Sequence, residues 1–172
     1  MAAIAFRRLS ADDLQSLYLW LDRPHVAKWY APTPSSFAEM AAKYGPRTEA
    51  SSVVRSYIVS VDGADCGYAQ TYPAIAFPDY AAALNCGSGA WGIDLFIADP
   101  WRLGHGLGTE VIRRFCSDIV RGECGATECV ADPAEGNAAS LRAFEKAGFA
   151  CAGEVRLEGE EPRWAMRLGA PT

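Results

Sequence analysis

The sequence is short of histidine and has no excess of positive charge. Its 172 residues include 2 histidines, and 16 lysine and arginine residues stand against 21 aspartate and glutamate residues, which gives a net charge of −5 at pH 7. Proteins that bind nucleic acid or an anionic membrane electrostatically usually carry a basic face. We therefore expect no nucleic acid and no membrane as partner, whereas a cationic small molecule is compatible with this charge.

The sequence also lacks the spacings of a metal site. No two of its 6 cysteines form a C-x-x-C pair. Scattered cysteines of this kind are typical of small buried side chains in a reducing compartment. We expect no metal and no disulfide framework. The cysteines are Cys66, Cys86, Cys116, Cys124, Cys129 and Cys151.

Long hydrophobic runs, polar linkers and internal repeats are absent as well. No stretch approaches the roughly 20 apolar residues that a membrane-spanning helix needs. The basic pair Arg7 and Arg8 follows a very short apolar run, which is the wrong order for a secretion signal. We expect a single domain over residues 1–172 that acts in the cytoplasm as a monomer or homodimer.

A glycine-rich segment, WRLGHGLGT at residues 101–109, separates an apolar run from a helix-like run. Three glycines at alternate positions leave backbone N–H groups with no side chain in front of them, just before a helix begins. The segment has neither the Gly-Lys-Ser/Thr of a P-loop nor the wider second gap of a dinucleotide fingerprint. It predicts a seat for a diphosphate, although the same pattern also forms simple turns.

Hydrophobic periodicity predicts alternating short strands and amphipathic helices. Helices are expected at about residues 10–22, 35–44, 110–120 and 137–148, with Asn137 as a cap. Residues 73–89 are expected to form a loop, with or without a short helical turn, and residues 158–161 an acidic turn. This order predicts an α/β (α+β) fold, a mixed sheet flanked by helices. The strands are expected at residues 4–8, 56–61, 66–72, 91–98, 126–131, 149–156 and 162–168.

Several stretches together resemble the GCN5-related N-acetyltransferase (GNAT) superfamily. They are GIDLFIADPWRLGHGLGT at residues 92–109, DPAEGN at residues 132–137 and RAFEKAGF at residues 142–149. WLDRPHV at residues 20–26 and GYAQTY at residues 67–72 add a similarity to the aminoglycoside 6'-N-acetyltransferases. The resemblance covers nearly the whole chain. It implies a central, mixed, mostly antiparallel, twisted sheet with a V-shaped splay between two central strands.

The resemblance implies acetyl-CoA as the donor, with its diphosphate on the glycine-rich segment and its pantetheine arm on backbone groups of Phe96 and Ile97. Asn137 would contact the pantetheine amide, or serve only as a helix cap. The family often has Arg or Gln where this chain has Leu103, so Arg102 and His105 are candidate substitutes. The residues expected to bind the coenzyme are Phe96, Ile97, Arg102, Leu103, Gly104, His105, Gly106, Leu107, Gly108, Thr109, Asn137 and Phe144.

Acetyl transfer from acetyl-CoA to an amine requires the amine to be neutral, because an ammonium cannot attack a thioester. Asp94 matches the acid that the resembled family uses near the amine, and its alternative role is an edge aspartate paired with an arginine. A backbone N–H at Phe96 or nearby would stabilise the oxyanion. The family's general-acid tyrosine is Phe144 here, so Ser140 is the candidate proton donor, unless it is merely helix surface.

Acids and aromatic rings are expected around the acceptor amine, because polycationic sugars need carboxylates and flat walls. By resemblance Asp132 contacts an aminoglycoside; alternatively, each acid is a solvated surface charge and Trp29 fills a helix junction. The expected function is acetyl transfer from acetyl-CoA to the 6'-amine of an aminoglycoside in a ternary complex. The alternatives are another acceptor (a siderophore hydroxylamine, a polyamine or a protein N-terminus) or a non-catalytic acyl-CoA-binding module. The acceptor residues expected are Trp29, Tyr30, Tyr44, Gln70, Asp79, Trp91, Asp94, Asp132 and Glu135.

Overall fold

The computed structural model describes residues 2–30, 32–156 and 161–169. The chain packs as two compact units. Unit 1 consists of Met1–Gln70 with Leu95–Leu103, and unit 2 of Thr71–Asp94 with Gly104–Thr172. The expectation of one domain over residues 1–172 stays a prediction.

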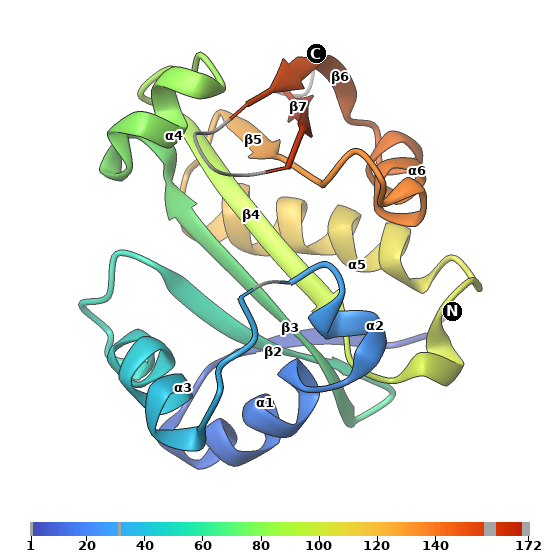
Figure 1. Cartoon of the computed structure of the whole chain (residues 1–172). Coiled ribbons are helices and arrows are strands. Elements are labelled where there is room, and N and C mark those ends of the chain that lie inside the picture. Colours follow the sequence, from blue (N-terminus) through green and yellow to red (C-terminus); the bar gives the residue numbers. More distant parts are fainter. Residues whose placement is uncertain (1, 31, 157–160, 170–172) are drawn as a thin grey trace. The chain divides into compact units, whose positions relative to one another are not determined.

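Seven strands form a mixed sheet in the order β1-β2-β3-β4-β5-β7-β6 (Figure 1). Strands β4 and β5 are parallel, and residues 90–92 pair with residues 128–130. The pairs β1 with β2, β5 with β7, and β6 with β7 are antiparallel. The predicted sheet, mixed, mostly antiparallel and flanked by helices, is confirmed, and the V-shaped splay stays a prediction. The strands are β1 (Ile4–Arg8), β2 (Arg55–Val61), β3 (Ala64–Pro73), β4 (Ala90–Ile97), β5 (Glu128–Ala131), β6 (Ala150–Val155) and β7 (Arg163–Leu168).

Unit 1 contains the helices α1 (Leu14–Leu21), α2 (Pro24–Ala27) and α3 (Phe37–Tyr44). The Oγ of Ser36 accepts the N–H of Glu39 at 3.1 Å, which caps α3 where the sequence predicted its start. The short helix α2 was not expected. It forms because Pro24 fixes φ at the first helical position, where no N–H is needed. The buried core of unit 1 is Leu9, Leu17, Leu21, Val26, Met40, Tyr44, Ile58, Tyr68, Phe96 and Ala98.

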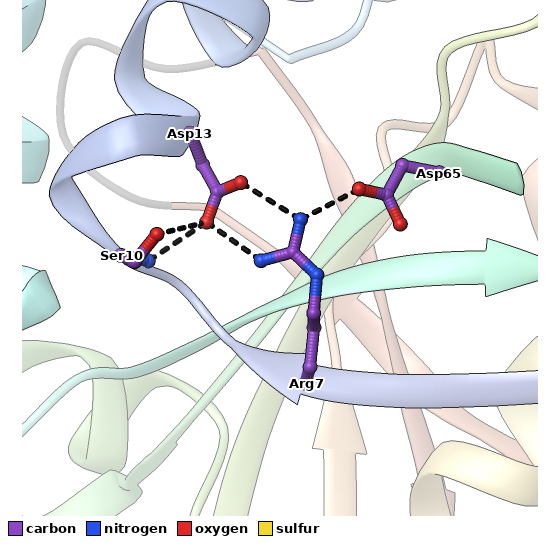
Figure 2. Close-up of polar contacts among 4 residues, drawn as sticks. All are labelled: Arg7, Ser10, Asp13 and Asp65. Carbon is purple, nitrogen blue, oxygen red and sulfur yellow. Dashed lines mark hydrogen bonds and ion pairs between the residues drawn. The ribbon is translucent and has the colours of Figure 1, made fainter.

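A polar cluster ties the first strand to the turn before α1 (Figure 2). The guanidinium of Arg7 makes two bonds of 2.8 Å to the two carboxylate oxygens of Asp13, and a third of 2.6 Å to Asp65. The N–H and the hydroxyl of Ser10 also donate to Asp13, each at 2.8 Å. The Arg7 guanidinium, followed by the Ser10 donors, lowers the pKa of Asp13 to about 2, against the cost of partial burial.

Unit 2 contains α4 (Pro78–Ala83), α5 (Leu107–Arg114) and α6 (Ala138–Lys146). A π-helical segment, Phe115–Glu123, continues α5. The expected helix at residues 110–120 therefore begins earlier, with Gly106 in the left-handed region as its N-cap, and the π-helical segment carries it on to Glu123. Its apolar face is buried as predicted, at Val111, Ile112, Phe115, Cys116, Ile119 and Val120.

Residues 73–89 are more ordered than a loop. A 3-10 turn at Ala74–Ala76 and the helix α4 occupy much of this segment, so the predicted short helical turn is present. Pro78 starts α4, and the alanines that follow favour helix. Leu84 packs in the core of unit 2 with Ala74, Ala90, Val130, Val155 and Ala165. This burial holds the segment in place.

The remaining expectations concern the cysteines and the chain's far end. Cys66, Cys116 and Cys129 are buried as small hydrophobic residues, whereas Cys151 is exposed. Most of the acidic turn expected at residues 158–161 lies outside the described residues. None of the described helices has the length and apolar character to cross a bilayer.

Candidate active site

The glycine-rich segment of unit 2 has the backbone that a diphosphate seat requires. Gly104 and Gly106 have φ values of 78° and 83°, in the left-handed region that favours glycine. A Cβ on Gly104, Gly106 or Gly108 would meet no atom within 4 Å, so the space in front of the backbone is open. Helix α5 begins directly at Leu107, and its first-turn N–H groups carry about half a positive elementary charge. His105 is exposed on the same segment.

The end of β4 belongs to unit 1, where the strand's alternation decides which backbone groups are accessible. The N–H of Ala98 donates to the Cys66 carbonyl of β3 at 2.7 Å. A Cβ on Gly67 of β3 would lie 2.5 Å from the Phe96 carbonyl, so Phe96 faces β3 as well. Because neighbouring residues point to opposite edges, Ile97 faces away from β3. Of the N–H groups expected at Phe96 or nearby to donate to the reacting oxygen, that of Ile97 is therefore the one that does not face β3, and its role stays a prediction.

Two side chains that the sequence analysis did not single out reach the end of this strand. The Nε2–H of His25 donates to the Ile97 carbonyl at 3.0 Å, and Arg23 donates to the Ala98 carbonyl at 2.5 Å. They line an open groove of about 540 Å³ together with Trp20, Asp65, Cys66 and Trp101. The only signal for them was the stretch WLDRPHV. Arg102 pairs with Asp99 at 3.3 Å, and Leu103 is exposed.

In unit 2, Asp94 lies half-buried on β4, near two tyrosines. The rings of Tyr72 and Tyr80 lie 5.7 Å apart at an angle of 64°. Burial raises the pKa of Tyr72, and the negative charge of Asp94 raises it further. Burial likewise raises the pKa of Tyr80, followed by the charges of Asp132 and Asp94. Both tyrosines therefore stay neutral, and their edge-to-face rings lie near the acid that sequence reasoning assigned to the amine.

Asp132 directly follows β5 and is 8% exposed. Its Oδ1 accepts the hydroxyl of Tyr80 at 3.3 Å, and its Oδ2 lies 3.3 Å from the Nη1 of Arg163. The same Nη1 donates to the backbone carbonyl of Asp132 at 2.8 Å. Asp132 is therefore not a solvated surface charge, which was the alternative to its expected contact with the acceptor. Tyr80 and Arg163 are further residues that the sequence analysis missed, because their link to Asp132 spans more than thirty positions in the chain.

The aromatic residues expected in unit 1 are mostly core. Tyr44 is 1% exposed and packs edge-on against Tyr68, with its ring 4.7 Å from the guanidinium of Arg47. Its expected role as an acceptor contact is therefore wrong, because its ring is enclosed by these neighbours. Buried Gln70 accepts from the Tyr68 hydroxyl at 2.8 Å and from Arg47. Half-buried Tyr30 packs against Tyr68 and Phe96.

The other expected residues divide between surface and interior. Trp29 is half-buried under the ammonium group of Lys28, and Trp91 is half-buried on β4. Asp79 and Glu135 are exposed. The Oδ1 of Asn137 accepts the N–H of half-buried Ser140 at 3.1 Å, so the helix cap is confirmed. Phe144 is 5% exposed, and its ring packs 5.0 Å from that of Phe149.

In the described ranges, no three His, Cys, Asp or Glu side chains gather to hold a metal ion.

Three features of unit 2 define an N-acetyltransferase of the GNAT class. They are a glycine-rich segment open before a helix, an acid on the preceding strand and a capped helix after the next strand. The model of the family described as "Acetyltransferase (GNAT) domain" matches residues 10–157. The class assignment thus covers most of the chain.

The relatives narrow this class. The aminoglycoside N(6')-acetyltransferase type 1 of Klebsiella pneumoniae is 32% identical over 155 residues, which are 89% of this chain and 77% of the relative. The structure of an aminoglycoside acetyltransferase, AAC(6')-Ib, with coenzyme A and kanamycin superposes with a TM-score of 0.86 at 31% identity, over 97% of this chain and 95% of that one. A kanamycin resistance protein of Rhizobium radiobacter is 36% identical over 67 residues, 39% of this chain and 61% of the relative. The chain belongs to the GNAT acetyltransferases, in the family of the aminoglycoside N(6')-acetyltransferases.

Proposed function

We propose that the protein transfers an acetyl group from acetyl-CoA to the 6'-amine of an aminoglycoside by direct attack in a ternary complex. The observation that carries the proposal is the match to an enzyme solved with coenzyme A and kanamycin, over nearly the full length of both chains. Acetyl-CoA supplies an activated thioester when bound. We place this activity in the cytoplasm.

The residues of the glycine-rich segment fit the coenzyme. Its diphosphate needs several converging N–H donors, and open glycines before α5 supply them without side-chain obstruction. Leu103 offers no hydrogen bond and Arg102 is engaged with Asp99, so the backbone is the main holder. In unit 1, the N–H of Ile97 is the proposed donor to the carbonyl oxygen that gains negative charge.

Asp94 is the residue we assign to the amine. The amine nitrogen bonds to the carbonyl carbon after its proton passes to the Asp94 carboxylate, directly or through water. The carbon–sulfur bond then breaks, and the leaving sulfur takes a proton. Phe144 has no hydroxyl for this and is buried, so half-buried Ser140 is the proposed donor. A thiol with a pKa of ~8.5 is a tolerable leaving group even with a weak donor.

The test compares Asp94→Asn with the matched control Asp118→Asn, an exposed aspartate of the same unit that belongs to none of the expected site residues. We expect the kcat for kanamycin to fall by about 10²- to 10⁴-fold in Asp94→Asn, the usual contribution of a general base. The Kd for coenzyme A should not change in either variant. Full activity in Asp94→Asn would remove Asp94 from the mechanism.

A panel of acceptors tests the substrate itself. Thiol release from acetyl-CoA is measured with kanamycin, a polyamine, a hydroxylamine and an N-terminal peptide. Preference for kanamycin supports the proposal. Preference for another amine keeps the class and changes the acceptor, and coenzyme binding without thiol release from any amine indicates a non-catalytic module.

A further inference from the structure

The carboxylate of Asp132 is engaged on both oxygens by its own protein. Tyr80 donates to Oδ1 and Arg163 to Oδ2, each at 3.3 Å, and the side chain is 8% exposed. If Asp132 holds a cationic group of the acceptor, that group meets a carboxylate whose charge Arg163 already balances. A buried ion pair of this kind differs from an open carboxylate, because the attraction for a second cation is largely cancelled.

The backbone fixes Arg163 in this place. Ala134 and Arg163 form an antiparallel bridge. On either side of it, Trp164 donates its N–H to the Pro133 carbonyl at 3.0 Å, and Glu135 donates to the Pro162 carbonyl at 2.9 Å. Arg163 begins β7, which pairs along β5, the strand that ends one residue before Asp132. The guanidinium therefore cannot leave Asp132 without breaking its 2.8 Å bond to the Asp132 carbonyl as well.

The other partner of the Asp132 carboxylate, Tyr80, is also held in place. Tyr80 lies on α4, and the end of that segment is bound by Arg167. Arg167 donates to the Leu84 carbonyl at 2.6 Å and pairs with both carboxylate oxygens of Glu128, at 2.8 and 2.9 Å. Two arginines of β7 thus act at this place, because Arg163 binds Asp132 directly and Arg167 binds the end of the helix that carries Tyr80.

We propose that Arg163 is a specificity-determining residue, which neutralises Asp132 and disfavours polycationic acceptors relative to amines with a single positive charge. The proposal rests on the proposed function, because it assigns Asp132 to the acceptor side. Arg163 acts through Asp132 and is a positioning residue. Arg163 reduces the preference for highly charged substrates, although it does not contact the transferred acetyl group.

The experiment uses two acceptors with the same reacting group, kanamycin as the polycation and 6-amino-6-deoxyglucose as the monoamine. Arg163→Gln keeps a donor for Asp132 and removes the charge, whereas the matched control Arg163→Lys keeps the charge. We expect Arg163→Gln to lower the KM for kanamycin about 10-fold, with kcat and the KM for the monoamine unchanged. Arg163→Lys should retain the wild-type ratio of the two KM values.

Two further measurements separate a charge effect from damage to the fold. The double variant Arg163→Gln/Asp132→Asn again has no net charge at this position, so its acceptor selectivity should match the wild type within about twofold. This variant decides the question if Arg163→Gln alone fails to fold. Equal changes for both acceptors, a lysine variant that behaves like the glutamine variant, or altered selectivity in the double variant would each overturn the proposal.

Failure of the proposed function is distinguishable from failure of this inference. Calorimetric titration of kanamycin into the protein saturated with coenzyme A needs no turnover. Tighter kanamycin binding by Arg163→Gln supports the role of Arg163 even if no acetyl transfer to kanamycin is found. Unchanged binding overturns that role even if transfer is rapid.

Discussion

Replacing Asp13 by asparagine should destabilise the protein in a way that depends on pH. In the native state the carboxylate accepts two bonds of 2.8 Å from Arg7 and two more from Ser10 (Figure 2). These donors lower its pKa from 3.8 to about 2. Folding is therefore favoured whenever the carboxylate is ionised.

The size of the effect follows from the two pKa values. The difference between 3.8 and about 2 corresponds to about 2.4 kcal/mol at neutral pH, at 1.36 kcal/mol for each pH unit. Arg7 is 46% exposed, and solvent screens such a pair, so we expect a loss of about 1–1.5 kcal/mol. Because the native pKa is the lower one, this stabilisation is complete above about pH 5 and disappears as the pH falls towards 2. At pH 3 about half of it should remain.

Urea unfolding of the wild type and of Asp13→Asn at pH 7, 5 and 3 checks this. Asp65→Asn is the matched control, because Asp65 makes one bond to the same guanidinium and is 41% exposed. It should cost about 0.5 kcal/mol or less. If Asp13→Asn costs as much at pH 3 as at pH 7, the carboxylate acts through the uncharged bond from the Ser10 N–H, and the electrostatic reasoning is refuted.

Two glycine substitutions test the site's backbone. Gly106→Ala and Gly125→Ala both place a side chain at positive φ, so each should cost about 1 kcal/mol, but only Gly106→Ala should weaken coenzyme A binding, as measured by calorimetry. Equal coenzyme A affinities would show that the diphosphate does not lie on this segment. In Gly92→Ala the new Cβ would lie 2.3 Å from the buried ring of Tyr72, which predicts a loss of about 1–3 kcal/mol and a melting temperature lower by about 2–10 °C. Gly45→Ala, where nothing lies within 4 Å, should change stability by less than about 0.5 kcal/mol, and a similar Tm for both variants would contradict the predicted clash.

Local features of the fold could be predicted from the sequence, because each depends on nearby residues. The cap at Asn137 and the apolar face of the helix after Gly106 both follow from short patterns. The start of α5 was placed too late because the glycine at its cap was counted with the segment before it.

The candidate site was predicted less completely, because it depends on pairing between distant segments. Which of Phe96 and Ile97 faces β3 is a matter of register, and shifting by one residue exchanges the two. The guanidinium of Arg163 and the hydroxyl of Tyr80 reach Asp132 only because of the pairing around β7 and the packing of α4. No periodicity in the sequence carries that information. Tyr44 was misassigned because an aromatic residue at a helix end fits a core as well as a cleft.

The cap at Asn137 fixes more than the start of a helix. With its oxygen accepting the N–H of Ser140, the carboxamide has a defined orientation, and its NH₂ group is the end that can donate to a ligand. A carbonyl oxygen placed at that end gains a hydrogen bond, so the helix cap also favours one orientation of a bound amide.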